Sequence, residues 1–219
     1  MAALSAFYAE IELQAPSVPR PVIDHAARNA CIEFADRSKV LQVTSDPQDL
    51  QANVADYDLD LPPGTQLVKL MAVWVYDDPP LALVSPEQVY AAAELYGTGD
   101  ASRPRYAFVR TPESSIVTLA PRPAVNAAGA LRCRFSYKPT RTATAVDDTL
   151  VNNWYEEICA GALARLRMIP NKSWSNPTQA AVDRQVFMAG VSRAVAQAHT
   201  SGTVTQGAVI GPRIFWSKR

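Results

Sequence analysis

The spacing of apolar residues changes along the chain, and the clearest pattern lies in its second half. Between residues 147 and 169, apolar side chains recur at intervals of three and four, which is typical of one face of an α-helix. They are Leu150, Trp154, Ile158, Ala162, Leu166 and Ile169. Asp147 and Asp148 are both suitable N-caps, and Pro170 ends the pattern. The pattern therefore predicts a helix over residues 147–169.

A second helix is expected after a short loop. Asn176 is a good N-cap, and Pro177 suits the first helical position. The apolar stripe that follows consists of Ala181, Met188, Val191, Val195 and Ala198. We expect a helix over residues 177–199, antiparallel to the preceding helix because the loop between them is short.

The first 40 residues predict one helix with a non-helical segment before it. Pro21 stands at a first helical position, and the helix is expected over residues 21–37. Its buried stripe is Ile23, Ala27, Ala30, Cys31 and Phe34. Residues 1–20 alternate apolar and polar side chains and contain two prolines near their end, so we interpret them as an extended lead-in.

Between these helices the period changes to two, which indicates strands. The expected strands cover residues 40–43, 49–54, 57–61, 66–76, 81–84, 105–110, 115–119 and 130–137. Ser85 as cap and Pro86 at the first position predict one small helix, which ends at Gly97. A run of strands enclosed by helices predicts an α+β fold: a bundle of three main helices with an inserted antiparallel β-rich region over residues 40–139.

Charge is divided unevenly between the two halves, although the formal net charge is zero. Residues 1–100 carry 15 acidic and 5 basic side chains, and residues 101–219 carry 6 acidic and 16 basic ones. The halves can pair with each other inside one chain, or they can attract charged partners head to tail. No apolar stretch approaches the length of about 18 residues that a membrane span needs, and no signal-peptide pattern is present.

Cysteine and histidine give little indication of chemistry. Cys31, Cys133 and Cys159 are far apart and form no CxxC or Cys/His cluster, so we expect no zinc site. His25 and His199 stand in no nucleophile or metal pattern. We expect no cofactor, no metal and no enzymatic activity.

Acidic and basic clusters also have simple structural explanations. Asp56, Asp58 and Asp60 have the spacing of a calcium loop but lack its glycine and distal glutamate, so the exposed face of a strand explains them better. Glu156-Glu157 fits a solvated helix face. Three basic residues lie along one expected strand and could approach nucleic acid, although protein-facing use is the preferred interpretation; they are Arg132, Arg134 and Lys138.

The last 20 residues differ from the rest of the chain. Residues 200–219 contain no acidic side chain and end in Arg213, Ile214, Phe215 and Trp216, followed by Lys218 and Arg219. Aromatic residues and arginine dominate the binding energy of protein interfaces. We expect an extended tail that binds another protein; the alternative is a tail that folds back and caps the helical bundle.

Four stretches carry a resemblance to a known family. They are residues 21–38, residues 55–65, the strand 131–139 that ends in Tyr-Lys-Pro, and residues 155–166 followed by 170–177. In their order along the chain and their residue patterns, these stretches resemble the head–tail adaptor proteins of tailed bacteriophages, which are also called head-completion or connector proteins. That family is related to tail tubular protein A of short-tailed phages. None of the stretches is a catalytic motif.

The resemblance implies a structural virion protein of the neck or tail, assembled in the host cytoplasm. It implies a homo-oligomeric ring, usually of twelve copies, that docks on the portal protein and gives the tail or nozzle protein a platform. DNA passes through the channel without sequence-specific binding. In this family the C-terminal segment commonly reaches the portal, so the expected portal-binding residues are Arg213, Ile214, Phe215, Trp216, Lys218 and Arg219.

The expected division of the chain comprises the lead-in (1–20), an adaptor domain (21–199) and a docking tail (200–219). The alternative functions are those of another neck or tail component, a nucleic-acid-binding accessory protein, or an enzyme.

Overall fold

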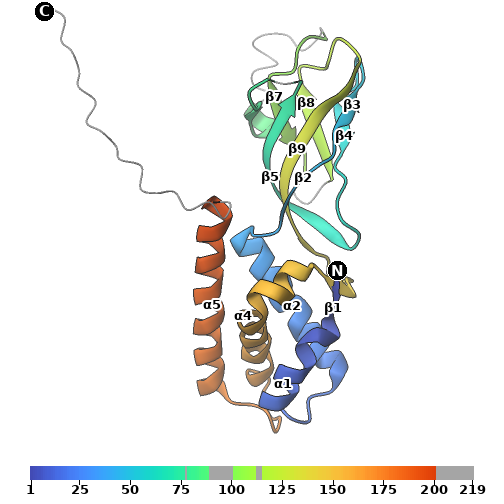
Figure 1. Cartoon of the computed structure of the whole chain (residues 1–219). Helices are drawn as coiled ribbons and strands as arrows, with labels where there is room; N and C mark the ends of the chain where they lie inside the picture. The colour runs from blue at the N-terminus through green and yellow to red at the C-terminus, as the bar shows by residue number, and fades with distance from the viewer. Residues whose placement is uncertain (77, 89–100, 112–114, 201–219) are drawn as a thin grey trace, which may run out of the picture.

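The computed structural model describes residues 1–76, 78–88, 101–111 and 115–200. These residues form two bodies, one helical and one rich in strands, joined end to end (Figure 1). The expected α+β class is confirmed. The docking tail beyond Thr200 lies outside the described residues, and so does most of the small helix expected to end at Gly97.

The helical body contains more than the three helices expected. Its described elements are η1 (Leu4–Phe7, a 3₁₀ helix), α1 (Tyr8–Gln14), α2 (Arg20–Ser38), α4 (Asp148–Arg167) and α5 (Pro177–Thr200). The expected helices correspond to α2, α4 and α5, with ends that differ by no more than about two residues. A bundle of three main helices is not confirmed, because η1 and α1 pack against α2 and α4 as well.

The extended lead-in expected over residues 1–20 is wrong. Most of this segment is helical, in η1 and α1, after the short strand β1 (Ala2–Ala3). Leu4, Phe7, Ile11 and Ala15 are spaced by three or four residues and belong to the same buried core as α2 and α4. The two prolines after α1 interrupt the helical path and do not mark an extended segment.

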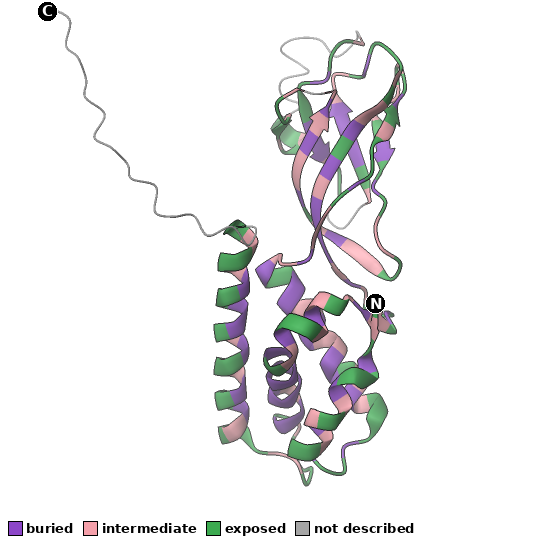
Figure 2. Cartoon of the chain, viewed as in Figure 1, coloured by how far each residue is buried: buried purple, intermediate pink, exposed green. Residues whose placement is uncertain are grey.

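Helix α4 runs through the middle of the helical body. The sequence predicted one buried stripe, but nearly all side chains of its second half are buried, because α1, α2 and α5 pack around it (Figure 2). A helix surrounded in this way needs apolar or small residues on all sides. The helix is also kinked at Trp154, whose φ of −134° and ψ of 24° are not helical and whose ring packs against Phe34.

The inner face of α5 differs from the expected stripe. Its buried positions are Ala180, Asp183, Phe187, Gly190, Val191 and Ala194. Ala181, which was expected inside, is exposed, and Met188 is half-buried. The sequence pattern was misleading because Asp183, a charged residue, occupies an inner position that apolar spacing alone does not reveal.

The β-rich body holds two four-stranded sheets. In the first, β9 (Ala127–Pro139) pairs antiparallel with β2 (Gln42–Thr44), β3 (Gln48–Leu50) and β5 (Thr65–Val75). The second has the order β4 (Asp56–Asp58), β8 (Ile116–Ala120), β7 (Tyr106–Val109), β6 (Ala82–Leu83). Each of the eight expected strands overlaps an observed one. The insertion is not wholly antiparallel, however, because β6 and β7 are parallel.

The start of the small helix after β6 is as expected. The Gln88 amide donates to Ser85 Oγ at 3.3 Å, and the Ser85 amide donates to Gln88 Oε1 at 2.9 Å. These reciprocal bonds form a capping box, which satisfies two backbone donors at the helix N-terminus.

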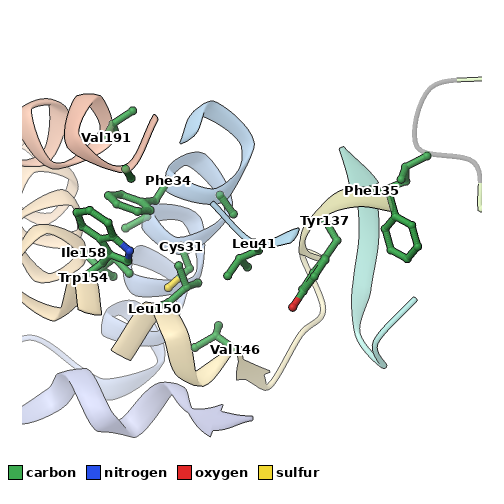
Figure 3. Close-up of a cluster of buried hydrophobic side chains, with 14 of the residues drawn as sticks. Cys31, Phe34, Leu41, Phe135, Tyr137, Val146, Leu150, Trp154, Ile158 and Val191 are labelled. Atoms are coloured by element: carbon green, nitrogen blue, oxygen red, sulfur yellow. The ribbon is translucent and has the colours of Figure 1, made fainter. Parts of the chain in front are cut away.

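Strand β9 connects the two bodies. It extends from the sheet toward the helices, and the buried side chains around it continue the helical core into the β-rich body (Figure 3). Tyr137 donates a hydrogen bond to Asp147 at 2.8 Å, and Asp147 caps α4 by accepting from the Thr149 amide at 2.8 Å. Burial opposes ionisation of Asp147, but hydrogen bonds from Thr149 and Tyr137 hold its pKa below the ordinary value. Lys138 pairs with Asp36 of α2 at 3.0 Å.

The central position of α4 predicts a large effect of charge at Ile158. Ile158 is fully buried, so Ile158→Asp places an unpaired carboxylate in the core and is expected to lower the free energy of unfolding by about 4 kcal/mol. Asn153→Asp adds the same carboxylate at an exposed position of α4 and is expected to have little effect. Urea denaturation of both variants measures the difference; equal stability of the two would contradict this placement of α4.

Candidate assembly surfaces

The residues expected to bind the portal lie outside the described part of the chain. They are Arg213, Ile214, Phe215, Trp216, Lys218 and Arg219, and their assignment stays a prediction. The C-terminal segment that contains them follows the end of α5, and the position of that end is fixed by a hydrogen bond. Gln42 Nε2 donates to the carbonyl oxygens of Lys39 at 3.0 Å and of Ala198 at 3.4 Å, which ties the last turn of α5 to the turn between α2 and β2. The segment therefore begins beside the junction of the two bodies (Figure 1).

A charge cluster fixes α5 to α2 and α4. The Glu33 carboxylate of α2 accepts hydrogen bonds from Arg165 of α4 and, at 3.0 Å for one of its oxygens, from Arg184 of α5. The hydrogen bonds from Arg184, followed by the positive charge of Arg165, hold the pKa of Glu33 below its usual value. Arg184 and Arg165 also lie over the ring of Phe187, 5.2 and 5.8 Å from its centroid. Three helices therefore meet at one carboxylate.

A second ion pair lies deeper in the helical body. Arg167 at the end of α4 pairs with Asp183 of α5, and both residues are buried. Arg167 also donates to the backbone carbonyl of Gln14 at 3.3 Å, and Gln179 donates to Asp183 at 3.2 Å. The end of α1, the end of α4 and the first half of α5 are thereby held at one level. Sequence patterns do not indicate this pair, because the two residues lie 16 positions apart on different helices.

A third pair corrects the interpretation of Glu156-Glu157 as a solvated helix face. Glu157 is buried and pairs with Arg193 of α5, whereas Glu156 is exposed as expected. Where α4 packs against α5, Glu157 lies against Gly190, and a side chain at position 190 would collide with Glu157. The pair therefore depends on a glycine in the opposite helix.

Some ion pairs join the acidic first half of the chain to its basic second half. Glu33 pairs with Arg165 and Arg184. The other such pairs are Asp36–Lys138, Asp56–Arg110 and Asp78–Arg103. Part of the uneven charge is therefore matched within one subunit, which agrees with the first of the two alternatives raised by the sequence and does not exclude the second.

The basic strand and the acidic triplet have structural explanations in the described residues. Arg134 donates to Gln42 at 2.7 Å and Lys138 pairs with Asp36, so two of the three basic side chains on β9 contact their own chain. Asp56, Asp58 and Asp60 are exposed, and the residues between them, Tyr57 and Leu59, are buried. Asp56 and Asp58 therefore lie on the outer face of β4, as the sequence indicated, and Asp60 continues the alternation just beyond the end of the strand.

Among the described residues, no group of three or more histidine, cysteine, aspartate or glutamate side chains could hold a metal ion. The three cysteines are buried, and burial raises the pKa of Cys133 and of Cys159 to about 12 and that of Cys31 further. Such thiols stay protonated and do not act as nucleophiles near neutral pH. None of the described helices combines the length and the hydropathy required for a membrane span.

Comparison with known protein families shows which family the chain resembles. The family model described as SU10 adaptor protein matches residues 3–210, which is nearly the whole chain. The chain therefore belongs to the SU10 adaptor protein family and is a phage adaptor protein, a structural component of the virion. No curated protein matches it. The expected resemblance to phage adaptors is thus confirmed, while the relation to tail tubular protein A stays a prediction.

The Glu33 cluster predicts a specific dependence of stability on pH. Because the pKa of Glu33 is lowered in the folded protein, its contribution is complete above the ordinary value of 4.5 and is lost as the pH falls through the lower folded value. Glu33→Gln is therefore expected to lower the melting temperature at pH 7 by several degrees, and the difference from the wild type is expected to shrink below about pH 4.5. Thermal unfolding between about pH 3 and pH 7 measures this.

Glu12→Gln provides the control for that experiment. Glu12 pairs with Arg20, whose side chain is largely exposed while that of Glu12 is about half-exposed, and such surface pairs contribute little. If the melting temperature of Glu33→Gln differed from that of the wild type by the same amount at every pH, ionisation of the Glu33 carboxylate would not be the cause of the difference.

Proposed function

We propose that this phage adaptor protein is a head–tail adaptor, which forms a homo-oligomeric ring on the portal protein. The ring, with twelve copies expected, would extend the DNA channel and give the tail or nozzle protein its attachment platform. The observation that carries the proposal is the family match over residues 3–210. The described fold supports it, because its polar side chains serve to hold helices together and not to assemble a reactive site.

The helical body is rigid, which suits a subunit that must hold the portal ring and the tail at a fixed separation. The second half of its central helix is packed on all sides, and three ion-pair groups hold α5 to α4 and α2. Close-packed interiors are stiff and transmit displacement with little deformation. A subunit built in this way can carry two binding surfaces at a fixed separation.

The C-terminal segment is the proposed portal-binding arm. It follows directly on α5, whose last turn is held by Gln42, so the arm starts from a fixed point on the subunit. Its composition suits docking, since Phe215 and Trp216 can fill apolar pockets and Arg213 can pair with acidic groups of the portal. DNA would pass through the ring without being read, and no residue of this chain is proposed to catalyse a reaction.

Ring formation on the portal protein of the same phage tests the assembly itself. Mixing the chain with that portal is expected to give a complex of defined mass by light scattering and a second ring, visible by electron microscopy, on the portal. A chain that stays monomeric alone is compatible with this function. Failure to bind the portal under any condition would refute it.

Deleting residues 207–219 tests the arm. The truncated chain is expected to keep its melting temperature, because a docking arm contributes to portal binding and not to the core of the subunit, and to lose binding to the portal. The double substitution Phe215→Ala with Trp216→Ala is expected to weaken binding at least 100-fold, as loss of two anchor side chains commonly does. Ser217→Ala is the matched control and should bind as the wild type does. Undiminished portal binding by the truncated chain would show that the arm does not dock there.

A further inference from the structure

The outer side of α5 has the character of an interface. The side turned away from the other helices is exposed along its whole length (Figure 2). Between Pro177 and Ser192 every exposed position of α5 is uncharged. Val182 and Val186, one helical turn apart, are 47% and 46% exposed, and Ala181 and Ala189 beside them are small. A solvent-facing helix normally carries charged side chains, whereas the centre of a protein interface is depleted of them.

A second exposed apolar side chain lies at the same level on another face of the helical body. Leu13 of α1 is 78% exposed, the most exposed of the large apolar residues described. The hydrogen bond from Arg167 to Gln14 and the ion pair of Arg167 with Asp183 place Leu13 at the height of Val182 and Val186. In Figure 1, α5 forms one flank of the helical body, and α4 stands between it and α1.

We propose that the α5 face around Val182 and Val186 binds the α1 face around Leu13 of a second copy of this chain. Two different surfaces at one height on different flanks are what a head-to-tail contact requires, and repetition of such a contact by rotation closes a ring. The exposed charges around the two surfaces have opposite signs, and most of them also have a partner within the subunit. Helix α1 carries Glu10 and Glu12, and Glu12 pairs with Arg20. The charged side chains of α5 that reach solvent, Arg184 and Arg193, are basic and pair with Glu33 and Glu157.

The proposal rests on the proposed function only for the closure of the ring; the contact itself is a property of this chain. In the alternative arrangement, the α5 face binds the α5 face of a second copy that is related to the first by a two-fold axis. That arrangement also buries Val182 and Val186, but it leaves Leu13 exposed and ends at a dimer. Cysteine cross-linking distinguishes the two arrangements.

The test combines Leu13→Cys with Val182→Cys or with Val186→Cys, two partners that allow for a shift of one helical turn in register. The native cysteines are buried and stay out of the reaction. Mild oxidation in the presence of the portal protein is expected to turn at least one double variant into a ladder of covalent multimers. Each single variant alone is expected to stay monomeric, and a mixture of two complementary single variants is expected to stop at dimers.

The matched control pairs Leu13→Cys with Ala196→Cys. Ala196 is also exposed on α5, but it lies about 20 Å along the helix from Val182 and is beyond the reach of a disulfide to the same partner. Val186→Glu is expected to abolish assembly without changing the melting temperature. Val125→Glu, at an exposed apolar position of the β-rich body, is expected to assemble normally.

Each result decides the question. A ring on the portal without a Leu13 ladder overturns the proposed contact and leaves the proposed function standing. Dimers formed by Val182→Cys or Val186→Cys alone overturn it in favour of the two-fold arrangement. A ladder formed by the concentrated chain without any portal binding supports the contact and refutes the portal function. If neither a ladder nor a ring forms, the proposed contact and the proposed function are both refuted.

Discussion

The close approach of α4 and α5 is the constraint on which the helical body depends. Each helix contributes a glycine that faces a large side chain of the other. A Cβ atom at Gly161 would lie 2.3 Å from Cδ2 of Phe187, and one at Gly190 would lie 2.3 Å from Cγ of Glu157. Real atoms cannot pack at that distance, so both positions require glycine. The two glycines also fix how far α5 can slide along α4.

That register sets the positions of the charged groups. With α5 seated on the glycines, Arg193 reaches Glu157, Asp183 reaches Arg167 and Arg184 reaches Glu33. A buried ion pair adds little net stability, because the loss of hydration offsets the attraction, but breaking one leaves a costly unpaired charge. The buried Arg167–Asp183 pair therefore acts mainly against other registers of α5, whereas Arg184 and Arg193 are partly exposed and their pairs contribute less. The same register determines which residues of α5 face solvent, and hence the uncharged outer face around Val182 and Val186.

Strand β9 couples this body to the sheets. It pairs with three strands, contributes Phe135 and Tyr137 to the shared core (Figure 3), and leads through the short strand β10 (Ala145–Val146) into α4. Contacts of Tyr137 with Asp147 and of Lys138 with Asp36 join it to two different helices. Because Gln42, next to β9 in the sheet, also holds the end of α5, the point where the C-terminal segment leaves the subunit is set by both bodies.

The sequence by itself determined the elements whose signal is local. Periodicity and capping residues located α2, α4 and α5 and all eight strands from β2 to β9, since apolar spacing and proline or aspartate at a helix start act within a few residues. The same local rules failed at η1 and α1, where nearby prolines outweighed a real helical spacing. Only the tertiary structure decided that Asp183 and Glu157 are buried, that Gly161 and Gly190 are contact points, and that Leu13 stands level with Val186. Those features depend on residues far apart in the chain, because a charged side chain can be buried only where folding brings it a partner.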